Sequence, residues 1–230
     1  MRDILRNRIE AGQLLAGKLI RHANQPNVIV LGLPRGGVPV AFGVAKALRV
    51  PLDVFVVRKL GTPGRRELAM GAIATGGVRV LNEEVVGGLG IPMDVIDAVT
   101  AEERQELKRR ELAYRGSYSE PEVSGKTVIL IDDGIATGST MRAAVRALNA
   151  QHPARSIVAV PTAAGSTYRE LRSEVDELVA LMTPERFYGV GEWYQDFSQT
   201  SDADVTDLLE RARSYSASPN VAGPAKTGGE

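Results

Sequence analysis

The sequence of 230 residues contains no cysteine and only two histidines. The absence of cysteine excludes disulfide frameworks, thiolate zinc sites and thiol nucleophiles. The histidines, His22 and His152, lie far apart in the sequence and lack the spacing of paired metal ligands, so we assign no role to either. A reducing interior is compatible with this composition, although it does not follow from it.

An excess of charge of one sign and long apolar runs are also missing. Lys and Arg together number 28, as do Asp and Glu, so the formal net charge is zero and no global field recruits nucleic acid. Any polyanion must therefore be bound locally. Charges interrupt the first 20 residues, which argues against a signal peptide, and no run approaches the roughly 20 apolar residues of a membrane span. We expect a cytoplasmic protein without a membrane partner.

Apolar residues alternate along the chain between helical spacing and short continuous runs. The predicted helices are 4–20, 38–49, 93–115, 139–150 and 166–175, and the predicted strands are 27–33, 52–60, 128–131, 156–163 and 177–184. A hairpin is expected over 72–82. This alternation is typical of an α/β fold with a doubly wound, mainly parallel sheet of Rossmann type, whose ligands bind beyond the carboxyl ends of the strands. We expect one domain over 1–213, followed by a disordered tail over 214–230 that is rich in Ser, Ala, Gly and Pro.

The stretch VILIDDGIATGSTM, residues 128–141, joins a buried strand to a helix through two carboxylates. Small residues and hydroxyls follow the carboxylates in a loop suited to a phosphate: Gly134, Ala136, Thr137, Gly138, Ser139 and Thr140. Because like charges repel, Asp132 and Asp133 are not expected to bind the phosphate. Carboxylates do accept hydrogen bonds from ribose hydroxyls, so the stretch predicts a site for a sugar phosphate. A helix cap beside an exposed turn is the alternative for an isolated Asp-Asp-Gly.

This string resembles the fingerprint of the type I phosphoribosyltransferases and is most similar to its adenine-type form. The resemblance implies that Asp132 and Asp133 are catalytic and face the ribose hydroxyls of phosphoribosyl pyrophosphate (PRPP), while Ala136 to Thr140 cradle its 5-phosphate and Gly134 belongs to the same ribose-phosphate site. Ala136 stands where hypoxanthine-guanine enzymes carry an acidic residue, which argues against that subclass. A P-loop is excluded because Gly-Lys-Ser and Gly-Lys-Thr are absent.

The stretch GLPRGGVP, residues 32–39, resembles the pyrophosphate loop of the same family. Its predicted pyrophosphate contacts are Pro34, Arg35, Gly36 and Gly37. Arg35 is also predicted to be catalytic, because negative charge gathers on the leaving pyrophosphate and a cation must meet it. A plain surface turn is the alternative interpretation.

The stretch VRKLGTPGRRELAMGAI, residues 57–73, is similar to the base of the flexible catalytic loop in adenine-type enzymes. The resemblance implies pyrophosphate contacts from Arg58 and Lys59, and catalytic roles for Lys59 and Glu67. Closure of such a loop would keep water from the activated sugar. Solvated charges on a hairpin are the alternative for Arg65, Arg66 and Glu67.

Type I enzymes cover the base with a variable hood, which we expect over about 185–200 together with the N-terminal helix. The aromatic residues predicted to bind a flat base are Phe187, Tyr188, Trp193 and Tyr194. A small core or a dimer contact is the alternative for each of them.

The resemblance implies a phosphoribosyltransferase that moves the 5-phosphoribosyl group from PRPP to a nitrogenous base or amine and releases pyrophosphate. Magnesium is the implied cofactor, bound through PRPP rather than a protein cage, with Asp132 and Asp133 as carboxylates that could also reach it. We expect a homodimer and no nucleic-acid partner. The alternative is a PRPP-sensing regulator on the same fold that binds nucleic acid. The acceptor is not assigned.

Overall fold

The structure, a computed structural model, describes residues 4–216, without the side chains of residues 66, 67, 215 and 216. Its central sheet has the strand order β2-β1-β6-β7-β8. These strands are β1 (Val28–Gly32), β2 (Leu52–Val54), β6 (Thr127–Ile131), β7 (Arg155–Thr162) and β8 (Glu177–Met182). Every neighbouring pair is parallel, which confirms the predicted α/β fold with a doubly wound sheet.

Helices cover both faces of this sheet, so its inner strands are apolar on both sides. The helices around the sheet are α1 (Arg8–Lys18), α2 (Gly37–Leu48), α5 (Ser139–Asn149), α6 (Gly165–Leu171) and α7 (Asp202–Ser216), with short 3₁₀ turns at η1 (Ile20–His22) and η2 (Val190–Trp193). Val30 and Ile129 belong to the core shared with α1, α2 and α7, whereas Leu31 and Leu130 belong to the core shared with α5 and α6. This alternation explains why β1 and β6 read as continuous apolar runs.

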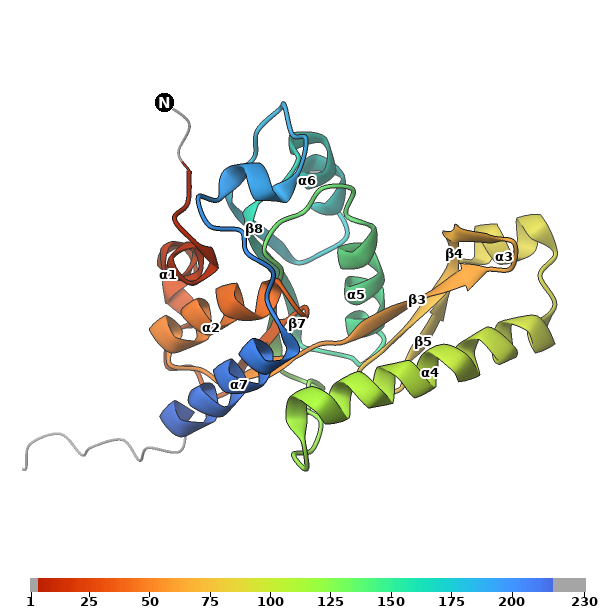
Figure 1. Cartoon of the computed structure of the whole chain (residues 1–230), viewed down its shortest axis with the longest axis horizontal. Coiled ribbons are helices and arrows are strands. Elements are labelled where there is room, and N and C mark those ends of the chain that lie inside the picture. The colour runs from red at the N-terminus through yellow and green to blue at the C-terminus, as the bar shows by residue number, and fades with distance from the viewer. Residues whose placement is uncertain (1–3, 217–230) are drawn as a thin grey trace, which may run out of the picture.

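A second, antiparallel sheet and two helices project from one side of the molecule (Figure 1). We call residues 57–115 the arm. It contains β3 (Val57–Thr62), β4 (Arg65–Ala74), β5 (Arg79–Leu81), α3 (Glu83–Leu89) and α4 (Met93–Arg115). The predicted hairpin over 72–82 is present as β4 and β5. Gly76 and Gly77 both have positive φ angles in its turn, a conformation that glycine adopts without steric cost.

The prediction of one strand over 52–60 was wrong, because the chain changes sheets after Val54. The backbone N–H of Phe55 still donates to the carbonyl of Gly32, but the N–H of Val56 donates to Oγ1 of Thr75 in the arm. From Val57 onward the chain pairs antiparallel with β4. Because the apolar run continues through Phe55 and Val56, the sequence gives no sign that the chain changes sheets there.

The C-terminal part differs from the predicted tail, which began at residue 214. Helix α7 extends to Ser216, and residues 217–230 lie outside the described range. Helix α7 packs against the central sheet layer through Val205, Leu208 and Leu209. The predicted hood segment lies beside the N-terminal segment, where the N–H of Leu5 donates to the carbonyl of Trp193. Among the described helices, none is long and apolar enough to cross a membrane.

Candidate functional site

The two predicted ligand loops meet at the carboxyl ends of β1 and β6. The strand order reverses between these strands, which is where ligands bind in open α/β sheets. A Cβ atom added to Gly36 would lie 2.1 Å from Oδ2 of Asp133, and one added to Gly37 would lie 2.6 Å from the carbonyl oxygen of Ile131. The backbone contact at Gly37 therefore requires glycine, and the paired-glycine turn lies directly against the two carboxylates.

Asp132 and Asp133 are crowded together in a poorly solvated position. Burial, and then the charge of Asp133, raise the pKa of Asp132 well above its usual range. Burial also raises the pKa of Asp133, although the Arg8 guanidinium opposes this effect. Oδ1 of Asp132 accepts a hydrogen bond from the backbone N–H of Asp133 at 2.9 Å. The fold thus maintains two carboxylates where a ligand or cation would compensate for their lost hydration.

Arg8, at the start of α1, is a site residue that the sequence analysis missed. Its Nε and Nη2 lie 2.9 and 2.8 Å from Oδ2 of Asp133, and its Nη1 donates to the carbonyl of Ser198 at 2.7 Å. The guanidinium also covers the ring of Phe197, 3.9 Å from the ring centroid. One arginine in an amphipathic helix gives no local signal of such a role. The contact joins residues 125 positions apart.

The predicted phosphate loop leads into α5, which begins at Ser139. Gly138 has a φ of 74°, and a Cβ there would lie 2.7 Å from Cγ2 of Thr167, so glycine is required at this position. Oγ1 of Thr167 donates to the carbonyl of Ala136 at 2.7 Å and fixes the loop from the side of α6. The predicted hydroxyl residues Thr137, Ser139 and Thr140 are exposed. Their backbone amides lie at the positive end of the α5 dipole, which favours an anion.

The arm brings only one of its two predicted cations to this loop. Nζ of Lys59 donates to Oγ of Ser139 at 2.7 Å. Arg58 points to the opposite face of β3, as neighbouring residues in a strand do, and its Nη2 lies 2.6 Å from a carboxylate oxygen of Glu103 in α4. The predicted pyrophosphate pair is thus divided between two faces of the arm. The side chain of Glu67 lies outside the described part of the structure.

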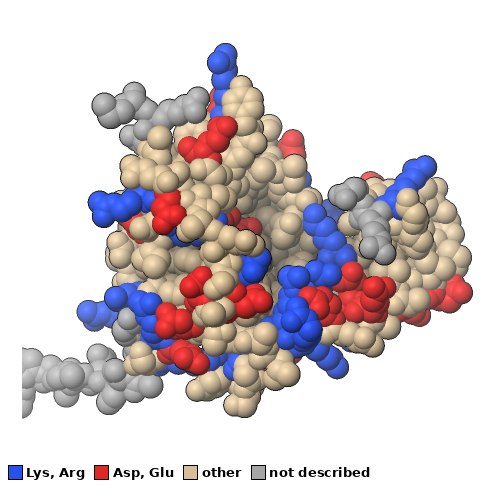
Figure 2. Space-filling model, in the orientation of Figure 1, with Lys and Arg blue, Asp and Glu red and all other residues tan. Residues whose placement is uncertain are grey.

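A groove between the arm and α5 opens beside this contact. It has a volume of about 390 Å³, and its lining includes Lys59 and Ser139 together with Arg142 and Arg146 of α5. Figure 2 shows basic and acidic side chains interspersed on the visible face, rather than a single basic stripe.

The four predicted base-binding aromatics do not form one platform. Trp193 and Tyr194 are buried with Leu5, and Phe187 stacks on Trp193 with a centroid distance of 6.3 Å. Tyr188 is 79% exposed. The hydroxyl of Tyr194 donates to the backbone carbonyl of Asp133 at 2.7 Å, and burial raises the pKa of that hydroxyl. Tyr194 therefore supports the carboxylate loop, in a position where stacking on a base is blocked.

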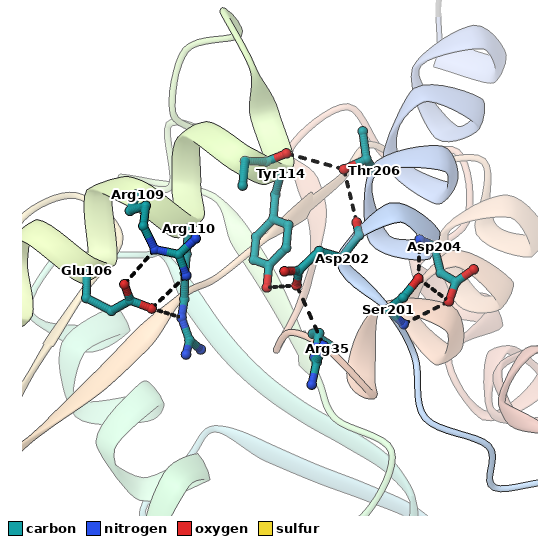
Figure 3. A network of polar contacts seen from close by, with 10 residues as sticks. Arg35, Glu106, Arg109, Arg110, Tyr114, Ser201, Asp202, Asp204 and Thr206 are labelled. Carbon is teal, nitrogen blue, oxygen red and sulfur yellow. Dashed lines mark hydrogen bonds and ion pairs between the residues drawn. The ribbon is translucent and has the colours of Figure 1, made fainter.

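Arg35 faces the first turn of α7, as Figure 3 shows. Its Nη1 lies 4.0 Å from Oδ1 of Asp202, and the same oxygen accepts a hydrogen bond from the hydroxyl of Tyr114 in α4 at 2.9 Å. Burial, and then this hydrogen bond, raise the pKa of Tyr114 to about 12. The peptide bond between Pro34 and Arg35 is cis. Asp202 was missed because no helix was predicted at α7.

Comparison with known proteins identifies a family and sequence relatives for this chain. The phosphoribosyl transferase domain family matches residues 3–191. Two Mycobacterium tuberculosis proteins, from strains CDC 1551 and H37Rv, are each 45% identical over 206 residues and are provisionally named phosphoribosyl transferases. The matches cover 90% of this chain and 46% of each relative, so the chain spans about half the length of these curated relatives.

A solved structure of related sequence has a similar fold. The crystal structure of TT1426 from Thermus thermophilus has a TM-score of 0.82 and 39% sequence identity, and the match covers 92% of this chain and 99% of that chain. Since the family match covers most of the chain and both ligand loops, the chain belongs to the type I phosphoribosyltransferase family.

Proposed function

We propose that this chain is a Mg²⁺-dependent phosphoribosyltransferase that transfers the 5-phosphoribosyl group of PRPP to a nitrogenous base or amine. The observation that carries the proposal is the contact between the paired-glycine turn and the two carboxylates. Gly36 lies against Asp133, and the phosphate loop continues directly from that residue. The proposed sites for a diphosphate, a ribose and a 5-phosphate therefore lie next to one another, in the same order as these groups in PRPP.

In the proposed reaction, the acceptor nitrogen forms a bond to the anomeric carbon as the bond to pyrophosphate breaks. The amides of the Ala136–Thr140 loop hold the 5-phosphate, and Asp132 and Asp133 accept hydrogen bonds from the ribose hydroxyls. Positive charge develops on the sugar, where the nearby carboxylates stabilise it. Arg35 meets the negative charge of the leaving pyrophosphate, and the acceptor loses a proton if it began as N–H.

The donor groups at the site fit a magnesium ion that arrives with PRPP. Within the part of the chain that the structure describes, no cluster of three or more His, Asp or Glu side chains could hold a metal. Mg²⁺ commonly needs only one or two carboxylates when substrate phosphates supply other ligands, and Asp132 and Asp133 are suitable oxygen donors. The bound ion would neutralise charge on the diphosphate.

The acceptor stays a nitrogenous base or an amine, because the aromatic cluster supports no narrower assignment. Trp193 and Tyr194 are buried, and the side chain of Tyr188 is largely exposed to solvent. A homodimer and a cytoplasmic location remain part of the proposal, and analytical ultracentrifugation would check the dimer.

Calorimetric titration with PRPP and Mg²⁺, followed by pyrophosphate-release assays with purines, pyrimidines and small amines, tests the proposal. We expect PRPP to bind and at least one acceptor to release pyrophosphate. Failure of both would refute the proposal. The alternative, a nucleic-acid-binding PRPP sensor, predicts PRPP binding without turnover, together with salt-dependent binding to nucleic acid.

A further inference from the structure

We propose that Arg8 is a positioning residue of the PRPP site, which acts on ribose binding by fixing the carboxylate of Asp133. This inference rests on the proposed function and goes beyond it, because Arg8 lies outside all the loops that carry the family resemblance. It belongs to α1, which precedes the first strand of the sheet.

The geometry leaves one oxygen of Asp133 for a ligand. Nε and Nη2 of Arg8 both contact Oδ2, at 2.9 and 2.8 Å. Among the described residues, no side chain donates a hydrogen bond to Oδ1. A forked contact to one oxygen restricts rotation of the carboxylate, so Oδ1 is held in one direction. A ribose hydroxyl would then find an acceptor that is already oriented.

Arg8 can act in this way because its own guanidinium is fixed. Nη1 donates to the carbonyl of Ser198, and Phe197 covers one face of the group. The side chains of Arg8 and Asp133 are only 11% and 15% exposed, so solvent weakens the ion pair little. The segment that fixes Arg8 also supplies Tyr194, whose hydroxyl holds the backbone of Asp133.

Displacement of the Asp133 carboxylate would also affect the pyrophosphate turn. The Cβ position of Gly36 is only 2.1 Å from Oδ2 of Asp133, so the carboxylate and the turn occupy adjoining space. If Arg8 were lost, a buried carboxylate would lack its cation and would turn toward other donors or solvent. The expected consequence is weaker PRPP binding, in addition to any loss of fold stability.

Three variants separate positioning from a purely structural role. Arg8→Gln removes the cation, and Arg8→Lys keeps the charge but cannot make the fork. Arg6→Gln is the matched control, because Arg6 lies two residues earlier, pairs with Glu10 and is 72% exposed. We expect Arg8→Gln to weaken PRPP binding about tenfold or more and Arg8→Lys to weaken it less, with the control within about twofold, as for an exposed pair. Affinities are measured by calorimetry with Mg²⁺, at a temperature where circular dichroism shows each variant folded.

A double-mutant cycle with Asp133→Asn then tests whether Arg8 acts through Asp133. We expect Arg8→Gln to weaken PRPP binding much less in the Asp133→Asn background than in the parent, because the coupled group is already altered. Equal effects in both backgrounds would overturn the inference. If Arg8→Gln does not fold, Arg8→Lys takes its place in the same cycle.

The outcomes distinguish this inference from the proposed function. If the parent binds PRPP and folded Arg8 variants bind it equally well, Arg8 is structural only and the proposed function stands. If the parent does not bind PRPP, the proposed function fails before any variant is compared.

Discussion

Carboxylates at the carboxyl edge of the sheet and on the arm differ in how well nearby cations compensate their charge. At the sheet edge, Asp132 and Asp133 are poorly solvated and share the single cation of Arg8, and the pKa of each is raised. On the arm, Glu106 is paired with both Arg109 and Arg110, and their hydrogen bonds lower its pKa to about 2. Charge is thus left under-compensated where we propose that a ligand binds. It is well paired where it faces water.

This contrast separates functional from supporting roles among residues of the same type. Under-compensated charge costs fold stability and is expected where binding or catalysis requires it. Well-paired surface charge contributes little to stability and is not expected to affect a ligand. The arm nevertheless reaches the site at one point, where Lys59 contacts Ser139. Mutations in each region therefore test whether the two kinds of charge differ in their effect on ligand binding.

A large loss of turnover is expected at the sheet edge from Arg35→Ala. Removal of a charge-assisted contact worth roughly 1.5 to 3 kcal/mol should lower turnover by about one to two powers of ten. Fold stability should change little, because Arg35 is 39% exposed and its only described ion pair, with Asp202, is 4.0 Å long. Steady-state kinetics and PRPP titration measure the effect. Parent-like values in both would exclude Arg35 from the pyrophosphate site.

The two neighbouring cations of the arm should differ sharply from each other. Lys59→Ala is expected to weaken binding of PRPP about tenfold, because it removes a cation beside the phosphate loop. Arg58→Ala should leave affinity within about twofold and lower only stability, since it breaks the pair with Glu103. Calorimetry and thermal denaturation of both variants provide the test. Equal losses of affinity would show that the arm moves Arg58 into the site.

Asp132→Asn should separate binding from folding. We expect PRPP binding to be lost while the free energy of unfolding at pH 8 rises by about 0.5 to 2 kcal/mol, because a poorly solvated carboxylate is replaced by a neutral isostere. Asn retains the oxygen that accepts the N–H of Asp133.

The gain in stability expected from Asp132→Asn should depend on pH, because the pKa of Asp132 is raised in the folded state. The folded state binds the proton more tightly than the unfolded state, so the carboxylate destabilises the fold as pH rises above the unfolded pKa of about 3.9. The stability gained by Asp132→Asn should therefore shrink as pH is lowered toward about 4. Urea denaturation across this range checks it, and a gain that does not depend on pH would contradict the assigned cause.

A smaller effect is expected from Asp202→Asn, which keeps the shape of the acceptor for Tyr114 but removes the charge facing Arg35. We predict a change in pyrophosphate affinity of about twofold to fivefold, because the partner is distant and partly exposed. Asp207→Asn is the matched control on α7, since Asp207 pairs with Arg211 instead. Product-inhibition kinetics with pyrophosphate measure both, and identical inhibition constants would remove Asp202 from the site.

The smallest effect should come from Glu106→Gln on the exposed side of the arm. Its pairs with Arg109 and Arg110 lie on the helix surface, so stability should change only slightly and PRPP affinity should not change. Thermal denaturation and PRPP titration are the measurements. A clear loss of PRPP affinity would break the distinction between the two regions.

Elements with local signals could be predicted from the sequence alone. The continuous apolar runs at 27–33 and 128–131 identified β1, β6 and their loops, because paired glycines follow the first run and carboxylates, glycines and hydroxyls follow the second. Backbone geometry at a strand end depends on such nearby residues. The doubly wound sheet followed from the alternation of strands and helices.

The side chains that meet these loops could not be predicted in this way, because tertiary packing brings them there. Arg8 reaches Asp133 across 125 positions, and Asp202 faces Arg35 from a helix that local periodicity had not identified. The contact of Lys59 with Ser139 depended on where the chain leaves the parallel sheet and joins the antiparallel one, and one continuous apolar run hides that point. The burial of Trp193 and Tyr194 likewise depended on Leu5, which packs against them. Such contacts arise from packing between segments that are distant in the sequence. The local pattern of residues around one side chain therefore does not indicate which distant residue it will contact.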